Sequence, residues 1–521
     1  YNNTWTAKYT SSGLDTAGDI TYSIEFVDSF GNVGVPVTAG SGSVTKIDDA
    51  DWSIIANTRT IDNPESIDPD SDSFGNAVAI YGETAVVGAK NNGIEGDLSG
   101  RAYIINAATG TTLHTLTNPN MYSSILSDRF GYSVDVSETH VIIGAPYEDS
   151  AATNGSSQGA AYIFDKSTGA LVHSLTAATY SQEAGNNFGF SVAIDGNYAV
   201  VGAPGEDQSL STDRDDGGAV YIYDVTTGEI VQNLQASSSE YQQVARRGYA
   251  VDISGDYVIM GAPYNRSGGD TGGRAYLWHI PTGTILNLYN PKASNGDYFG
   301  WTVAISGDYA VVGAKFEDDP RVNSGYVYVY RVSTGALIQS ITNPNTYSTA
   351  DHDNFGSAVA ISDNKIIVGA EGEDSITGPW NYTTGVSSGT AYIFSINEDA
   401  GNVTIPLVQT LFNPNAVGTS YNDYFGSAVA MYEDRVIVGA FGEDDNSGQD
   451  QGKVYIFDSI ADDANSTPTL SNVNILSNNE DNARAVENDV ITLSFEADKI
   501  IATPVVTFYS GSAAITNSVT Y

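Results

Sequence analysis

The chain of 521 residues has no cysteine, only five histidines and only 21 basic residues. The absence of cysteine excludes disulfides, zinc–thiolate sites and cysteine catalysis. No apolar run approaches the roughly 18 residues that a membrane-spanning helix needs, so no membrane insertion is expected. The few histidines lack partners at the spacing of a zinc site or a catalytic triad, which indicates that the chain is not an enzyme.

The balance of charge is strongly acidic. The chain carries 63 acidic residues against 21 basic ones, which gives a formal net charge of −42 at pH 7. Nucleic acid is therefore not expected as a partner, because proteins bind the phosphate backbone through basic patches. A charge of this sign favours solubility and cation binding, and it suits a saline habitat where salt screens self-repulsion.

What the sequence does contain is one pattern repeated seven times between residues 74 and 458. Each copy begins with Phe-Gly, or Arg-Gly in the fourth copy, and a Gly-Ala pair follows 14 residues after the Phe or Arg. The seven copies begin at Phe74, Phe130, Phe188, Arg247, Phe299, Phe355 and Phe425. A Tyr in an apolar segment follows at a variable distance. Fixed spacing within copies and variable spacing between them indicate a repeated supersecondary unit.

Each copy predicts four short strands. In the third copy these are residues 191–194, 198–201, 219–223 and 230–234, which are rich in β-branched and aromatic residues. About two polar residues join the first two segments of each copy, as in a hairpin. Seven four-stranded antiparallel sheets around one axis form a seven-bladed β-propeller, so the predicted fold class is all-β.

The seventh copy supplies only three such segments, and a fourth is found before the first copy. Residues 54–64 resemble the fourth segments 113–119 and 407–414, and all three end in Asn-Pro. We therefore predict that a strand near 52–62 completes the last blade and closes the ring by strand exchange, which removes an exposed sheet edge. The propeller would then span residues 49–460.

The sequence motifs of the repeats and their spacing resemble FG-GAP repeats, which occur in the integrin α-subunit propeller and in many bacterial surface proteins. Three copies match the Gly-Ala-Pro wording to the letter, at Gly144-Ala145-Pro146, Gly202-Ala203-Pro204 and Gly261-Ala262-Pro263. The resemblance implies a propeller fold and a bacterial protein at the cell surface or outside the cell. It does not fix the function, because one fold serves many functions.

The two tails read as halves of one domain. Joined in the order 467–521 and then 1–48, they have the length of an immunoglobulin-like (Ig-like) sandwich. In that order they also resemble the Ig-like modules of giant repetitive bacterial adhesins. Alternating apolar residues, typical of strands, occur at 5–9, 20–26, 490–497 and 504–508. Residues 461–466 would be a linker.

Half a sandwich would leave open sheet edges and an uncovered core, so each tail needs a complement. The chain could be one period of a longer polypeptide, cut inside its Ig-like module. Separate chains could instead complement each other head to tail by exchanging strands. In a third arrangement both halves fold together within one chain. We favour the first two, which predict a fibre or a string of domains.

Acidic residues recur at two positions of the repeat. An Asp stands two residues before the Phe in five copies, and a Glu-Asp pair stands four and five residues after the first Gly of Gly-Ala in five copies. The first set is Asp72, Asp128, Asp297, Asp353 and Asp423. The second set is Glu148, Asp149, Glu206, Asp207, Glu317, Asp318, Glu373, Asp374, Glu443 and Asp444. The fourth copy loses both positions together, which suggests that the two positions meet in space.

One hypothesis is that Ca²⁺ is held between these loops by carboxylates and backbone carbonyls, since calcium prefers hard oxygen ligands. The alternative is that the Asp and Glu side chains accept backbone N–H bonds in tight turns. The integrin-type loop Asp-x-Asp-x-Asp-Gly is not intact in any copy, and Asp68-Pro69-Asp70-Ser71-Asp72 is one of the nearest approaches. This departure weakens a direct transfer of calcium sites from the family.

A long loop in the sixth copy, residues 375–388, carries Trp380 and Tyr382. These rings could stack on a sugar or contact a protein, or the loop could cover its own blade. The leading hypothesis for the whole chain is an extracellular structural or adhesive repeat unit that assembles with copies of itself through residues 1–48 and 467–521. The alternative is an adhesin propeller that binds a glycan or a protein. A weaker alternative is a polysaccharide-active enzyme, which would need a catalytic cluster at the mouth of the ring.

Overall fold

The structure of the chain is a computed structural model, and it describes most of the propeller and the strands of the two tails. The described residues of the propeller are 57–64, 72–93, 98–120, 127–149, 157–177, 185–206, 217–235, 245–266, 272–292, 294, 296–318, 322–344, 352–373, 387–399, 401–414, 422–443 and 451–458. Within these ranges the regular secondary structure is all strand, without a helix. The described part of the chain accordingly holds no helix long and apolar enough to cross a membrane.

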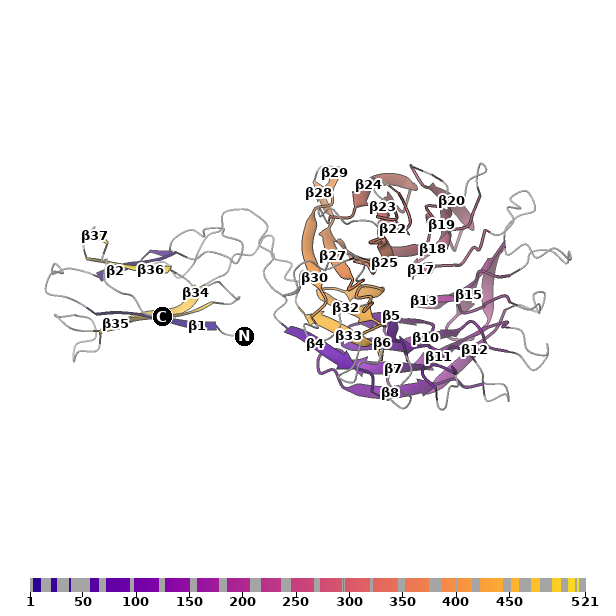
Figure 1. The fold of residues 1–521 in the computed structure, drawn as a ribbon, viewed down its shortest axis with the longest axis horizontal. Helices are drawn as coiled ribbons and strands as arrows, with labels where there is room; N and C mark the ends of the chain where they lie inside the picture. The colour runs from indigo at the N-terminus through magenta and orange to yellow at the C-terminus, as the bar shows by residue number, and fades with distance from the viewer. Residues whose placement is uncertain are drawn as a thin grey trace. The chain divides into compact units, whose positions relative to one another are not determined.

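Seven four-stranded antiparallel sheets stand around a common axis, which confirms the predicted all-β fold and the seven-bladed β-propeller (Figure 1). We number the sheets as blades 1 to 7. Blade 1 contains β5 (Phe74–Tyr81), β6 (Thr84–Ala89), β7 (Arg101–Asn106) and β8 (Thr112–Thr117). Blade 2 contains β9 (Ser133–Val136), β10 (His140–Ala145), β11 (Ala160–Asp165) and β12 (Leu171–Leu175). Blade 3 contains β13 (Ser191–Asp195), β14 (Tyr198–Ala203), β15 (Ala219–Asp224) and β16 (Ile230–Gln235).

The remaining blades follow the same order of strands. Blade 4 contains β17 (Val251–Ser254), β18 (Tyr257–Ala262), β19 (Arg274–His279) and β20 (Thr284–Tyr289). Blade 5 contains β21 (Thr302–Ser306), β22 (Tyr309–Ala314), β23 (Tyr326–Arg331) and β24 (Ala336–Thr342). Blade 6 contains β25 (Phe355–Ser362), β26 (Lys365–Ala370), β27 (Thr390–Ser395) and β30 (Leu407–Phe412), with a short hairpin of β28 (Asn397–Asp399) and β29 (Asn402–Thr404) inserted before its last strand.

Blade 7 contains β31 (Ala428–Tyr432), β32 (Arg435–Ala440) and β33 (Lys453–Asp458), and the strand beside β33 is β4 (Asn57–Asp62). Blade 7 also contacts blade 1 directly. The amide of Phe74 donates to the carbonyl of Gln451 (3.2 Å), and Arg435 Nη1 donates to the carbonyl of Gly82 (3.0 Å). The first blade is therefore hydrogen-bonded to the last.

The repeated glycines are explained by close approach between neighbouring blades. The first Gly of each Gly-Ala pair lies against the carbonyl oxygen of the Gly that follows the Phe or Arg of the next blade, and a Cβ there would collide with it. Gly439 of blade 7 lies in this way against Gly75 of blade 1, whose φ is +87°. Glycine is therefore required at both positions, at Gly439 because a Cβ would collide and at Gly75 because its φ is left-handed. The same contact between these two glycines is therefore repeated between neighbouring blades around the ring, and both glycines keep their places in every copy.

The core lies between adjacent blades. The Phe of each Phe-Gly pair is fully buried and packs against the ring of the repeated Tyr of the third strand in its own blade, as in Phe188–Tyr221 (ring centroids 5.6 Å apart). The apolar second strands, such as Ala199-Val200-Val201, are covered on both faces. The repeated Phe and Tyr residues therefore belong to the core.

The tails form a second compact unit, which comprises residues 1–57 and 458–521. Its strands are β1 (Asn3–Thr10), β2 (Ile20–Glu25), β3 (Val37–Thr38), β34 (Leu470–Ser477), β35 (Val490–Ala497), β36 (Val505–Ser510) and β37 (Ala513–Ala514). They form two sheets, in the orders β1-β35-β34 and β3-β2-β36-β37. Each sheet combines strands from both ends of the chain, which is the pairing that the third arrangement of the tails describes. The predicted linker 461–466 lies outside the described residues.

Candidate functional site

The acidic positions of the repeat meet in buried clusters between neighbouring blades. In blade 2, Asn118 Nδ2 donates to Asp128 Oδ2 (3.1 Å) and to Glu148 Oε2 (3.2 Å). Tyr162 Oη donates to Glu148 Oε1 (2.6 Å). Asn118 follows the last strand of blade 1, whereas the other three residues belong to blade 2. The cluster therefore ties the two blades together through side chains.

The same interblade carboxylate cluster recurs around the ring. Asn290 bridges Asp297 and Glu317 (3.1 and 3.4 Å), and Asn413 bridges Asp423 and Glu443 (3.0 Å to each). Asn343 donates to Asp353 (2.8 Å), and Asn63 donates to Asp72 (2.6 Å). The Tyr hydroxyls that donate to a Glu of the same blade are Tyr162, Tyr221, Tyr328, Tyr392 and Tyr455. The two acidic positions do lie together, as their joint loss from the fourth copy suggested.

The bridging asparagine was not recognised as a functional position in the sequence. Its signal is an Asn-Pro pair directly after the fourth strand, at Asn63-Pro64, Asn118-Pro119, Asn290-Pro291, Asn343-Pro344 and Asn413-Pro414. This pair helped to identify the closing segment, but its amide could not be assigned a partner. The partner belongs to the next blade, so only the three-dimensional structure brings the two together.

Burial raises the pKa of carboxyl and tyrosine hydroxyl groups in these clusters. Desolvation raises the pKa of Glu317 to about 7, although the hydrogen bond from Tyr328 opposes the shift. It also raises the pKa of Glu148 and of Asp297. Desolvation, followed by the nearby Glu317 charge, raises the pKa of the Tyr328 hydroxyl. Tyr328 thus remains a proton donor, while Glu317 gains a proton near neutral pH.

Blade 4 replaces the cluster with a different set of contacts. Ala245 stands in place of the Asp and Asn265 in place of the Glu, and Arg247 replaces the buried Phe. Arg247 Nη2 and Asn265 Nδ2 both donate to Tyr276 Oη (3.2 and 3.3 Å), and the guanidinium lies over the Tyr276 ring. In this blade the tyrosine hydroxyl accepts hydrogen bonds, whereas in blades with the Glu it donates one.

The Asp of the Glu-Asp pair stabilises the loop that follows it in blades 2 and 5. Asp149 Oδ1 accepts the backbone N–H of Ser157 (2.8 Å), and Asp318 Oδ1 accepts that of Asn323 (2.7 Å). These are the turn contacts of the alternative interpretation. The equivalent residues Asp207, Asp374 and Asp444 lie outside the described residues, as do Trp380 and Tyr382 of the sixth copy.

The clusters of blades 2 and 5 do not fit a calcium ion between their two carboxylates. Asn118 Oδ1 accepts the backbone N–H of Asn120 (2.9 Å), and Asn290 Oδ1 accepts that of Lys292 (2.8 Å). These bonds direct each amide nitrogen, a donor, at the carboxylates where calcium would require oxygen ligands. Among the described residues there is also no group of three His, Cys, Asp or Glu arranged to hold a metal.

Calcium binding elsewhere in the acidic loops stays a prediction, and chelation tests it. We expect EDTA to lower the melting temperature and added Ca²⁺ to restore it, because the ion would join loops that otherwise repel one another. Asp444→Asn should abolish the response, whereas Asp318→Asn should leave it intact, since Asp318 is committed to a turn. A melting temperature that responds to neither EDTA nor Ca²⁺ would show that calcium does not stabilise this chain.

The innermost strands of the seven blades enclose a central channel with a cavity of about 390 Å³. Its wall is mostly Val, Ile and Ala, but Asp135 and Asp252 replace the Ala of the other copies. Asp135 Oδ2 accepts the backbone N–H of Ile194, and Asp252 Oδ2 that of Ile305 (2.7 Å each). Desolvation raises the pKa of Asp135 to about 8 and that of Asp252 to about 7. These carboxyl groups link adjacent blades along the channel.

Six segments of the chain match the model of the FG-GAP repeat. The matched residues are 69–105, 126–164, 173–223, 288–330, 348–394 and 416–457. The segment between the third and fourth matches contains the divergent copy with Arg247 and is unmatched. No curated protein matches the chain in sequence. The chain thus contains FG-GAP repeats, which contribute strands to six of the seven blades of its propeller.

Proposed function

We propose that the chain is an extracellular adhesive module of a bacterial cell surface, in which the propeller binds a ligand and the tails connect it to its neighbours. FG-GAP repeats are typical of extracellular proteins, which supports the location. The observation that carries the proposal is the set of interblade contacts, such as Asn118 to Asp128 and Glu148. They make the propeller a rigid body whose loops can present binding groups.

The strand order of blade 7 supports closure of the ring by strand exchange. β4 precedes the first blade in the chain and lies beside β33 of the last. Both ends of the propeller would then be held in one sheet. Force applied to the tails would act on the hydrogen bonds between β4 and β33 and would not detach a terminal blade. This suits a module that transmits force along a string.

The tails support a role in assembly. β1 pairs with β35 from Asn3↔Ala497 to Thr10↔Val490, and β2 pairs with β36 from Ile20↔Ser510 to Glu25↔Val505. Made between successive units instead of within one, the same pairings would complete a split Ig-like module and link the units head to tail. We propose this exchange as the route to a fibre.

Light scattering and electron microscopy of the full chain test the assembly. We expect particles heavier than one chain and strings with a regular repeat. Ser494→Pro should prevent them, because β35 is the central strand of its sheet and proline removes a ladder hydrogen bond there. Ser494→Thr is the matched control. Single-chain particles at every concentration would indicate that the tails pair within one chain, and head-to-tail exchange would be wrong.

A non-enzymatic role is part of the proposal. Two histidines make structural contacts, His114 with the carbonyl of Ser167 (2.9 Å) and His173 with that of Thr226 (3.2 Å). Both contacts join neighbouring blades. Binding of the full chain to glycan and protein arrays, together with assays of polysaccharide turnover, tests the function. Turnover of any polysaccharide would favour the enzyme alternative, and the absence of binding on both arrays would refute the adhesive one.

A further inference from the structure

Four aromatic rings from four consecutive blades form a continuous arc, which we name the aromatic arc and define as Tyr132, Phe190, Tyr249 and Trp301. Successive ring centroids are 4.9, 4.9 and 4.8 Å apart, and successive planes are tilted by 46°, 46° and 48°. All four side chains are half-buried. Contacts at this spacing and tilt make the rings one surface.

The aromatic arc occupies one position of the repeat, directly after the Phe-Gly or Arg-Gly pair of blades 2 to 5. The remaining blades have small polar residues there, namely Asn76, Ser357 and Ser427. The position lies at the beginning of the innermost strand of each blade, either just before it or in its first three residues, so the arc and its polar counterpart surround the same end of the central channel. One side of this rim is thus aromatic and the other is polar.

Basic side chains gather on this rim. Lys90 Nζ lies over the Tyr132 ring (5.3 Å to the centroid), and Lys315 Nζ lies over Trp301 (4.3 Å). A second row of rings, just outside the arc, carries two more cations. Arg129 lies over Tyr147 (4.8 Å) and Arg246 over Tyr264 (4.7 Å).

This clustering is unusual for a chain with 63 acidic and 21 basic residues. Burial lowers the pKa of Lys90, the neighbouring Arg129 lowers it further, and Glu371 opposes the shift. Lys90 of blade 1 lies over Tyr132 and Arg129 of blade 2 over Tyr147, and these two rings are in contact (6.0 Å between centroids), so the two cations are neighbours. Two cations held together at a partly buried place favour an anionic group between them.

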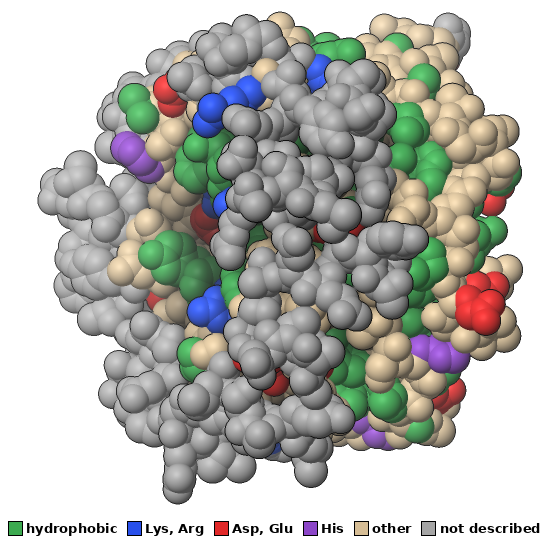
Figure 2. All heavy atoms as spheres, turned by 90° about the vertical axis from the view of Figure 1, so that its right-hand side faces the viewer, with side chains coloured by type: hydrophobic (Ala, Val, Ile, Leu, Met, Phe, Trp, Pro, Cys, Tyr) green, Lys and Arg blue, Asp and Glu red, His purple; other side chains and the backbone are tan. Residues whose placement is uncertain are grey.

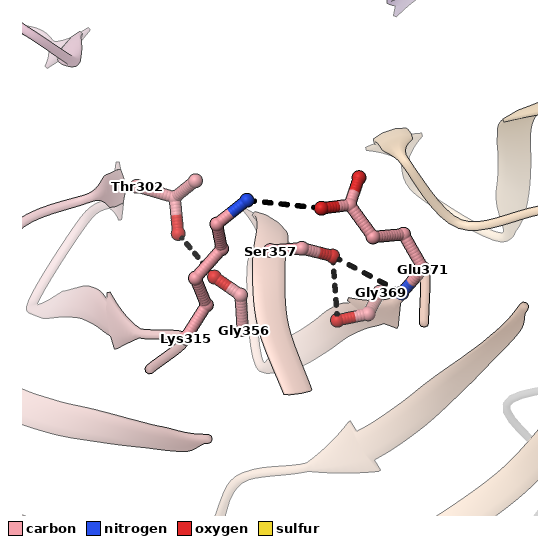
Figure 3. A network of polar contacts seen from close by, with 6 residues as sticks. All are labelled: Thr302, Lys315, Gly356, Ser357, Gly369 and Glu371. Atoms are coloured by element: carbon pink, nitrogen blue, oxygen red, sulfur yellow. Dashed lines mark hydrogen bonds and ion pairs between the residues drawn. The ribbon is translucent and has the colours of Figure 1, made fainter. Parts of the chain in front are cut away.

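The polar side of the rim is built from hydrogen bonds between blades 5 and 6 (Figure 3). Lys315 Nζ forms an ion pair with Glu371 Oε1 (2.9 Å), and the Glu371 backbone N–H donates to Ser357 Oγ (3.3 Å). Thr302 Oγ1 donates to the carbonyl of Gly356 (2.9 Å). These contacts hold Lys315 between an aromatic ring and a carboxylate, so its direction is set before any ligand binds.

We propose that this rim binds an anionic glycan, a chain of sugars that carries carboxylate or sulfate groups, and this deepens the ligand-binding function proposed above. Aromatic rings stack on the C–H faces of sugars and bury apolar area there. The ammonium and guanidinium groups pair with carboxylate or sulfate. Neutral glycans lack the charge, and anionic proteins lack the repeated flat faces, so the combination selects acidic sugars.

One face of the chain carries hydrophobic, acidic and basic side chains among residues that are not described (Figure 2). Lys166 also lies over an aromatic ring, that of Tyr81 (5.0 Å), and Tyr81 packs against Tyr432 (4.6 Å). Tyr81 ends its innermost strand, whereas the aromatic arc precedes such strands, so this second aromatic pair marks the opposite end of the channel. This pair also combines aromatic rings with a cation, but it is not part of the aromatic arc.

Calorimetry of the full chain with three hexasaccharides tests the inference: oligogalacturonate, a heparin hexasaccharide and neutral maltohexaose. We expect the acidic sugars to bind and maltohexaose not to. Trp301→Ala should weaken binding by about tenfold or more, since one lost stacking contact is worth more than the energy of a tenfold change. Lys90→Gln with Lys315→Gln should weaken it about tenfold in low salt and little in about 0.5 M NaCl, where charges are screened.

Lys166→Gln and Tyr432→Ala are the matched controls and should leave binding unchanged. Preference for oligogalacturonate or for heparin decides whether carboxylate or sulfate is the recognised group. If the wild-type chain binds an acidic sugar and the Trp301 and lysine variants bind it equally well, the arc is not the site, although the ligand-binding function stands. If the chain binds neither acidic sugar yet binds partners on protein arrays, the glycan proposal is wrong and the adhesive function remains. Melting curves of each variant separate loss of binding from loss of folding.

Discussion

Replacing Gly439 by alanine is expected to lower the free energy of unfolding of the propeller by about 3 kcal/mol or more. A Cβ at this position would overlap the carbonyl oxygen of Gly75 in blade 1. Backbone cannot move aside as the end of a flexible side chain can, so the two blades must separate or tilt. The melting temperature of the propeller should fall by about 4 °C, given the unfolding entropy of some 400 residues.

The position of Gly439 makes this prediction specific to ring closure. Blades 7 and 1 are also joined by the hydrogen bond from Phe74 N–H to the carbonyl of Gln451 and by the ion pair between Arg435 and Glu83 (3.2 Å). All of these contacts depend on the distance that the glycine pair sets. We therefore expect Gly439→Ala to raise the rate of proteolysis at both termini of the propeller as well.

Gly196→Asn is the matched control for Gly439→Ala. Gly196 lies in the turn between β13 and β14 with φ +53°, and a Cβ there would meet no atom within 4 Å. Asparagine tolerates this backbone conformation better than other residues, so the control should change the melting temperature by little. Equal loss of stability in both variants would show that any loss of glycine is harmful, and the close-approach explanation would fail.

Replacing Glu317 by alanine is expected to lower the free energy of unfolding by about 3 kcal/mol. Tyr328 Oη donates to both carboxylate oxygens (2.7 Å each), and Asn290 Nδ2 lies within reach of Oε2 (3.4 Å). Without the carboxylate the tyrosine hydroxyl loses its buried acceptor and a cavity opens between blades 4 and 5. Thermal or chemical denaturation measures the loss.

The pH dependence of Glu317→Gln tests the same cluster without a cavity. Burial raises the pKa of Glu317 from 4.5 to about 7, so the protonated form is the one that the fold favours. Its contribution to stability is complete below pH 4.5 and is lost as the pH rises through 7. The glutamine cannot ionise. We therefore expect the free energy of unfolding of the variant to rise relative to that of the wild type by on the order of 2–3 kcal/mol between pH 4.5 and 8.

Asp318→Asn supplies the control for both substitutions at Glu317. Asp318 is the next residue, but it is exposed and accepts only the backbone N–H of Asn323, which the asparagine oxygen can still accept. Its melting curves should follow those of the wild type across the pH range. A Glu317→Gln variant that also parallels the wild type at every pH would contradict the shifted pKa.

The repeating unit and the number of its copies follow from local patterns in the amino-acid sequence. A Gly-Ala pair 14 residues after each Phe or Arg, and apolar segments separated by turn residues, specify seven four-stranded sheets because the contact between blades is the same each time. Even the divergent copy with Arg247 keeps the offset and the fold, as β17 to β20 show. Local patterns were sufficient here, since every blade packs on a neighbour of the same design.

The candidate sites were only partly accessible from the sequence. The joint loss of two acidic positions in the fourth copy indicated that Asp and Glu meet, and they do, through an asparagine from the preceding blade. Asn118 and Glu148 are 30 residues apart in sequence, and no local rule pairs them. The same holds for Asp135, which stands in an alanine position and bonds a strand of the next blade.

The tertiary structure alone decided which side chains share a surface. Tyr132, Phe190, Tyr249 and Trp301 are more than 50 residues apart along the chain and became one arc because the ring places equivalent positions of consecutive blades side by side. The sequence fixes what each blade presents at a position, since periodicity and spacing are local properties. Which neighbours complete a surface is set by closure of the ring, and closure depends on contacts such as that between Gly439 and Gly75 that span the whole propeller.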